Sequence, residues 1–161
     1  MQRTVIDDME EDLTIQIDYD DIMERCKMLS SYEGRDRHDA NGQSLYEKVV
    51  ITEQDEQLIN GYISQSLLAA REQLADMIAT VDDETDGEET WTINPQRRYD
   101  SKGSKNLTKH LTEALAASVM TAWLTYNSVD DRSGFYQTVY ENEIRLISDN
   151  LHTKAAPTRP Q

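Results

Sequence analysis

Residues 114 to 124 read Ala-Leu-Ala-Ala-Ser-Val-Met-Thr-Ala-Trp-Leu and are apolar or small almost throughout. A helix of this composition has no polar face to turn toward water, so the sequence predicts that it lies at the centre of the fold. The periodic pattern extends this helix from about Asn106 to Asn127. One of its faces carries Leu107, Leu111, Leu115, Val119, Ala122, Trp123 and Tyr126.

Two further helices are predicted on the N-terminal side of this segment. From Tyr19 to Tyr32 apolar residues recur every three or four positions, and an aspartate before them can cap the first turn. Thr52 and Asp55 have the spacing of a capping box, and an apolar stripe follows them through about Ala79. At 1.5 Å per residue this second helix would be roughly 40 Å long.

A fourth helix is predicted after a turn from Ser128 to Gly134, and it should end near His152. The prolines at 157 and 160 cannot continue a helix, so residues 153–161 are expected to form an extended tail. The apolar stripe of this helix is Tyr136, Val139, Tyr140, Glu143, Ile144, Ile147 and Leu151, in which Glu143 is the polar member.

Extended structure is predicted in two places. Residues 12–17 alternate between apolar and polar side chains, which is typical of a short half-buried strand. Residues 81–105 break the helical period with an acidic run followed by Trp91-Thr92-Ile93, which favours an extended excursion or a hairpin. Residues 33–51 have little periodicity and are expected to form a loop with a short extended piece at its end, residues 49–51.

These elements predict a mainly α fold, a four-helix-bundle-like domain with a long central helix and a small β or extended excursion. A chain of 161 residues has room for one compact domain. We assign residues 1–18 to an N-terminal arm or strand, 19–152 to the helical domain with its acidic excursion at 81–105, and 153–161 to the tail. No apolar run approaches the roughly 18 residues of a membrane span, and the N-terminus has no secretory pattern, so no membrane contact is expected.

The chain is strongly acidic, with 31 acids, 16 bases and a formal charge of −15. Such a charge repels DNA phosphates and anionic lipid heads, which disfavours broad binding to either. Acids crowd the first 24 residues and positions 82–89, whereas bases concentrate at 97–109. This segregation permits a head-to-tail contact between two copies, although a solvated surface with uneven charge is the simpler interpretation.

The sequence contains no recognisable catalytic or metal-binding pattern. The histidines, His38, His110 and His152, are not spaced as metal ligands, and Cys26 is expected to pack as a small apolar residue. Acids alternate from Asp82 onward as in a calcium loop, but the twelfth position holds Ile93 instead of glutamate. We therefore expect neither an enzyme nor a cofactor.

Two segments could form contacts with other chains. Trp91 and Ile93 lie close in sequence to Arg97 and Arg98, and aromatic residues with arginine are typical of binding hot spots. The same aromatic and apolar residues could instead anchor the excursion onto its own core. The proline-containing tail is either a disordered end or a segment that docks onto a neighbour.

The layout resembles the head-to-tail connector (adaptor) proteins of tailed bacteriophages over roughly residues 51–160. The segments that carry the resemblance are Ile51-Thr52-Glu53-Gln54-Asp55 with Leu58-Ile59-Asn60-Gly61-Tyr62-Ile63, the Ala-rich stretch from Leu115 to Leu124, and Asn150-Leu151-His152 before Pro157-Thr158-Arg159-Pro160. The N-terminal strand and first helix have no counterpart in this pattern.

The resemblance implies a virion protein at the phage neck, made in the bacterial host cytoplasm, that forms a ring below the portal with DNA passing through its centre. Such rings commonly have twelve copies, and twelve chains of charge −15 carry −180 in total. A lumen of like charge would let the duplex slide instead of binding it. The candidate lining residues are Asp82, Asp83, Glu84, Asp86, Glu88 and Glu89. The candidate subunit or portal contacts are Trp91, Ile93, Arg97, Arg98, Lys102, Pro157 and Arg159.

Two other functions remain open from the sequence. One is a tail-completion or assembly protein of the same phage module that never joins the ring. The other is an acidic DNA mimic that inhibits a nucleic-acid-binding enzyme, in which acids spaced like phosphates form the working surface.

Overall fold

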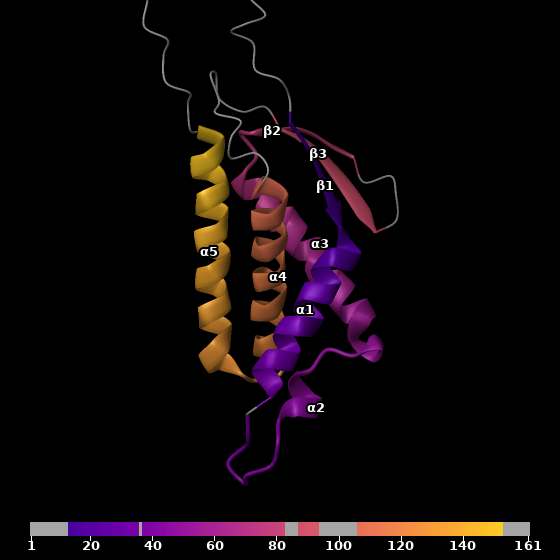
Figure 1. Cartoon of the computed structure of the whole chain (residues 1–161), viewed down its shortest axis with the longest axis vertical. Coiled ribbons are helices and arrows are strands. Elements are labelled where there is room, and N and C mark those ends of the chain that lie inside the picture. Colours follow the sequence, from indigo (N-terminus) through magenta and orange to yellow (C-terminus); the bar gives the residue numbers. More distant parts are fainter. Residues whose placement is uncertain (1–12, 36, 83–86, 94–105, 153–161) are drawn as a thin grey trace, which may run out of the picture.

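The computed structural model describes residues 13–35, 37–82, 87–93 and 106–152 (Figure 1). Within them the chain is mainly helical with a small three-stranded antiparallel sheet. In chain order the elements are β1 (Leu13–Asp18), α1 (Tyr19–Gly34), α2 (Tyr46–Val49), a 3-10 turn (Glu53–Asp55), α3 (Glu56–Gln73), β2 (Ile78–Asp82), β3 (Glu88–Ile93), α4 (Leu107–Tyr126) and α5 (Asp130–His152).

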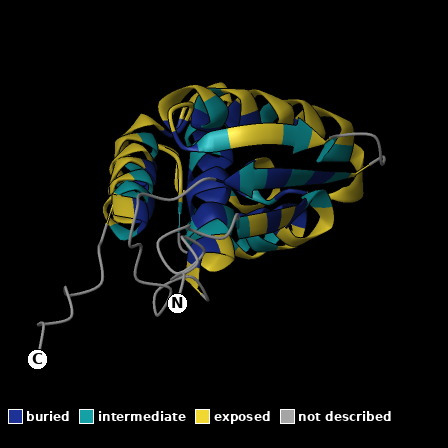
Figure 2. Cartoon of the chain, turned by 90° about the horizontal axis from the view of Figure 1, so that it is seen from above, coloured by how far each residue is buried: buried dark blue, intermediate teal, exposed yellow. Residues whose placement is uncertain are grey.

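Helix α4 is the centre of the molecule, as the sequence predicts. Ten of its 20 residues are buried, among them Ala114, Ala116 and Ala117. It packs against α5, α1, α3 and β1. Figure 2 shows it as the dark-blue element enclosed by the others, and Figure 1 shows α5 running antiparallel beside it. From Leu111 to Leu124 no residue of α4 is exposed, which follows from the mostly small and apolar side chains of this segment.

The sheet has the strand order β1-β3-β2, and both pairs are antiparallel. Its buried face is made of residues that lie opposite one another, such as Ile15 with Trp91 and Leu13 with Ile93. Strand β3 alternates between partly buried and fully buried residues, because successive side chains of a strand point to opposite faces. The sheet therefore covers the helices with one face and turns threonines such as Thr14 and Thr92 to the other.

Several expected elements are confirmed. The first strand and first helix form as predicted, and the helix continues to Gly34. Thr52 N–H donates to an Asp55 carboxylate oxygen at 2.9 Å, which confirms the capping interaction before α3. Helix α5 ends at His152 within the described residues but begins at Asp130, so five of the seven residues of the expected turn, 128–134, are helical. Of the two alternatives for 81–105, an extended excursion or a hairpin, a hairpin is present as the β2–β3 pair, but it begins earlier, at Ile78, and residues 94–105 lie outside the described residues.

The long helix expected from Thr52 to Ala79 is wrong. Helix α3 ends at Gln73, and the residues from Ile78 onward form β2. Ile78 lies opposite Ile93 in β3. Pairing with β3 therefore makes this segment a strand, although its apolar spacing also fits a helix. A four-helix bundle is not confirmed, since the sheet also packs against α4.

Residues 46–51 also differ from the expected extended piece. Residues 46–49 form the short helix α2, and only Val50 after it is extended. Helix α2 lies against the end of α1, where a Cβ on Gly34 would stand 3.2 Å from the Tyr46 backbone. The missing side chain of this glycine therefore allows the close approach of the two helices.

We predict that Leu124→Ala, in buried α4, lowers the free energy of unfolding by about 3 kcal/mol, because it leaves a cavity in the core. The control is Leu146→Ala on the exposed side of α5, which should change stability by less than about 0.5 kcal/mol. Urea unfolding followed by circular dichroism measures both. Equal losses in the two variants would contradict the central position of α4.

Candidate functional site: hairpin acids and the α1–α5 network

Three acids meet at one end of the sheet. Asp82 is the last residue of β2 and is exposed, and Glu88 is the first residue of β3 and is partly exposed. Asp18 lies directly opposite Glu88 in the antiparallel register. Glu88 accepts a hydrogen bond from the Gln16 side-chain amide at 3.0 Å. The predicted lining residues Asp83, Glu84 and Asp86 lie outside the described residues.

The assignment of Glu89 to this exposed acidic surface is wrong. Its side chain is 2% exposed, because β3 turns it to the covered face of the sheet. One carboxylate oxygen accepts from Trp91 Nε1 at 2.7 Å and from Arg71 Nε at 2.6 Å, and Arg71 Nη2 donates to the same oxygen. Glu89 is thus one partner of a buried ion pair that joins β3 to α3.

The assignment of Trp91 and Ile93 to a contact between chains is also wrong. Both are buried within the chain, and Trp91 is 0% exposed between Ile15 of β1 and Val81 of β2. The alternative interpretation, that they anchor the hairpin onto its own core, describes their position. The other predicted contact residues, Arg97, Arg98, Lys102, Pro157 and Arg159, lie outside the described residues and stay predictions.

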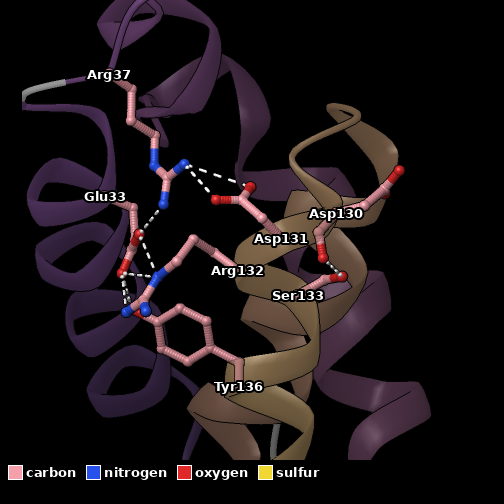
Figure 3. A network of polar contacts seen from close by, with 7 residues as sticks. All are labelled: Glu33, Arg37, Asp130, Asp131, Arg132, Ser133 and Tyr136. Atoms are coloured by element: carbon pink, nitrogen blue, oxygen red, sulfur yellow. Dashed lines mark hydrogen bonds and ion pairs between the residues drawn. The ribbon is translucent and has the colours of Figure 1, made fainter.

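A polar network joins the end of α1 to the start of α5 (Figure 3). Its centre is Glu33, whose side chain is 10% exposed. Glu33 accepts hydrogen bonds from Arg132 Nη2 at 2.9 Å, Arg37 Nη2 at 3.0 Å and the Tyr136 hydroxyl at 3.0 Å. Arg37 also donates to Asp131 at 3.1 Å. Two arginines therefore share two carboxylates across segments about 100 positions apart in the sequence.

The network holds its acids in the charged form. Burial by itself would raise the pKa of Glu33, but the hydrogen bonds from Arg132, Arg37 and Tyr136 outweigh it and lower that pKa. The hydrogen bond from Arg37 lowers the pKa of Asp131. Burial, and then the nearby Glu33, raises the pKa of the Tyr136 hydroxyl. At neutral pH the Tyr136 hydroxyl therefore donates a hydrogen bond, and the Glu33 carboxylate accepts from three donors. This arrangement holds α1 and α5 together.

This network could not be read from the sequence pattern. Four of its members, Glu33, Arg37, Asp131 and Arg132, fall in segments assigned to a loop and a turn, where no periodicity marks them, and Tyr136 belongs to an apolar helical stripe. The one readable signal was Glu33 four positions before Arg37, the spacing of a helical ion pair. The Arg132 guanidinium also lies 4.1 Å from the ring centroid of Phe135, a cation–π contact that holds it in place.

The remaining candidate groups have ordinary structural partners. Cys26 is buried as predicted, and burial raises the pKa of its thiol to about 12. His110 Nδ1 lies 2.6 Å from a Glu143 carboxylate oxygen on α5. Among the described residues no group of three or more His, Cys, Asp or Glu side chains is arranged to hold a metal ion. The same residues contain no helix long and apolar enough to span a bilayer.

Comparison of the chain with protein-family models, with curated proteins and with solved structures finds no match.

We predict that Arg71→Met lowers the free energy of unfolding by about 3 kcal/mol, because it leaves the buried Glu89 carboxylate without its cation. Adding Glu89→Gln in the double variant should restore part of the loss, since the amide oxygen still accepts from Trp91. Arg145→Met on exposed α5 serves as the matched control and should be nearly neutral. A double variant no more stable than Arg71→Met alone would contradict the role of the ion pair.

We predict that Glu33→Gln destabilises the protein by roughly 2 kcal/mol at neutral pH, because two arginines lose their shared charge. Since the folded-state pKa of Glu33 is lowered, its contribution is full above the unfolded value of about 4.3. As the pH falls through the folded-state pKa of Glu33, that contribution is lost. The free energies of unfolding of the natural chain and of Glu33→Gln then become equal. Urea unfolding between pH 3 and 7 measures this, with Glu72→Gln on exposed α3 as control. A pH-independent difference would refute the assignment.

Proposed function

We propose that the chain is a structural virion protein, a subunit of the head-to-tail connector ring at the neck of a tailed bacteriophage. In this role a ring of copies sits below the portal, and the genome passes through its lumen. The observation that carries the proposal is the acidic end of the sheet, where Asp82 and Glu88 lie at the turn end of the β2–β3 hairpin and Asp18 lies opposite Glu88.

The electrostatics of this end suit a channel that DNA traverses without binding. Duplex DNA carries one negative charge per about 1.7 Å, so a lining of carboxylates repels it from the wall. In the sequence, Asp82 and Glu88 border residues 83–86, three of which are acids. Glu89 takes no part, since it is paired with Arg71 inside the fold.

The layout of the helices supports the same role. The resemblance to connector proteins rests on three segments. They are the capped start of α3, the alanine-rich α4, and the end of α5 at His152 before the proline-containing tail. The bases Arg97, Arg98 and Lys102 and the tail residues Pro157 and Arg159 are proposed to contact neighbouring subunits or the portal.

The buried acids support a structural role over a catalytic one. Glu33 and Glu89 are buried carboxylates of the kind that enzymes use as acids or bases, but each is held by arginine. Hydrogen bonds from these arginines therefore already occupy both carboxylates. We therefore propose that the protein works through its surfaces.

The proposal predicts that purified particles of the source phage contain this chain in the same number of copies as the portal protein. Quantitative mass spectrometry with isotope-labelled peptides of the chain, the portal and the major capsid protein measures the three numbers. The portal and capsid proteins, whose ratio is set by the particle's symmetry, provide the internal control.

A copy number equal to that of the portal supports a neck component. Absence from intact particles would overturn the connector function. In that case the presence of the chain in assembly intermediates would indicate an assembly protein, and its recovery with a basic enzyme would indicate a DNA mimic.

A further inference from the structure

The chain contains two Asn-Gly pairs, Asn41-Gly42 and Asn60-Gly61. Asparagine is a chemically labile residue, and it loses its side-chain amide most readily before glycine, which leaves the next backbone nitrogen uncovered. The two pairs lie in different local structures, a loop between α1 and α2 and the helix α3. The fold therefore decides which of them can react.

Both pairs are open to solvent. The asparagine and the glycine of each pair are exposed. A Cβ placed on Gly42 or on Gly61 would meet no atom of a more distant residue within 4 Å. Access of water is thus matched at the two sites, and the conformation of the backbone is what differs between them.

Asn41 lies in a tight turn. Gly42 has a φ of +79°, and its N–H donates to the Asp39 carbonyl at 3.0 Å. One Asp39 carboxylate oxygen accepts from the backbone N–H of Asn41 at 2.8 Å and from that of Gln43 at 2.9 Å. These bonds all lie within residues 39–43, so the turn can open without breaking a helix or the sheet.

Asn60 lies inside α3, four residues after its first residue, Glu56. In an α-helix the Gly61 N–H is bonded to the carbonyl four residues earlier. Bringing the Gly61 nitrogen to the Asn60 side chain requires a change of ψ that breaks helical bonds on both sides. Ile59 and Ile63 are 0% exposed and anchor this part of the helix in the core. Helix α3 thus holds Asn60 in a conformation that does not react.

We propose that Asn41 is a site of spontaneous deamidation and that α3 protects Asn60 from the same reaction. The backbone nitrogen of Gly42 attacks the side-chain carbonyl carbon of Asn41. The bond from this carbon to the side-chain nitrogen breaks, and ammonia leaves with the proton of the Gly42 N–H. The product is a cyclic succinimide.

Water then opens the succinimide at either of its two carbonyl carbons, and the ring nitrogen regains a proton. Breaking the newly formed bond gives aspartate at position 41. Breaking the original peptide bond gives isoaspartate, in which the backbone runs through the former side chain. Overall, one water is consumed and one ammonia is released.

Both products add a negative charge two positions after Asp39, and isoaspartate also lengthens the backbone of the turn by one carbon. The loop is connected to the α1–α5 network, because Leu45 N–H donates to the Arg37 carbonyl at 2.8 Å and the Arg37 side chain binds Glu33. Isoaspartate therefore changes the chain length between Arg37 and α2. This modification is independent of the proposed function and of any location in a virion.

Trypsin places the two pairs on separate peptides, residues 38–48 and 49–71, so both can be followed in one sample. The purified full-length chain is kept at neutral pH for several weeks, and mass spectrometry of digested samples measures the deamidated fraction at each asparagine. Labelling by an isoaspartyl methyltransferase detects isoaspartate. We expect Asn41 to react at least about tenfold faster than Asn60 in the folded protein. In concentrated urea, where α3 is unfolded, the two rates should become similar.

Matched variants identify the reacting residue in the intact protein. Ion-exchange chromatography of the aged natural chain should resolve a more acidic species. Asn41→Ser should lack this species, and Asn60→Ser should retain it. Equal rates at the two asparagines of the folded protein, or loss of the acidic species in Asn60→Ser alone, would overturn the proposal. A tenfold difference that persists in urea would also overturn it, because flanking sequence and not α3 would then protect Asn60.

Discussion

The burial of the middle of α4, residues 111–124, is the constraint on which the remaining structure depends. A helix satisfies its own backbone hydrogen bonds, so it can be enclosed completely where its side chains are apolar or small. The alanines at 114, 116 and 117 let neighbouring backbones approach closely. Helices α1, α3 and α5 and strand β1 all use this one surface, so segments from both halves of the chain are brought together by a single 20-residue element.

The chain has few basic residues, and two of its arginines hold the elements around α4 in place. Acids outnumber bases by 31 to 16, and the few arginines inside the fold are placed where one residue joins two elements. Arg71 ties α3 to β3 through Glu89, and Arg132 ties α5 to α1 through Glu33. Helix α5 packs mainly on α4, so this tie and the bond from the Tyr140 hydroxyl to Gln73 at 2.9 Å orient it toward α1 and α3.

Helices α1 and α5 and the body of α3 could be predicted from the sequence because each repeats a local pattern, and α4 could be predicted because its middle lacks a polar side. Strand β2 could not be predicted in this way. Leu74, Met77 and Ile78 continue the apolar spacing of α3. Ile78 nevertheless belongs to a strand, because it pairs with Ile93 of β3, fifteen positions away. Short apolar segments fit either structure, and a partner distant in the sequence decides between them.

The errors at the hairpin have one physical origin. A count of charges groups Glu89 with its acidic neighbours, but alternation along a strand groups it with Trp91 and Ile93. Burying the tryptophan therefore buries the glutamate, which needs a cation, and Arg71 supplies it. The same alternation leaves Glu88 on the opposite face, beside Gln16. In the part of the chain that the structure describes, every buried side-chain nitrogen and oxygen has a partner. The buried polar groups of these residues are therefore already paired within the fold.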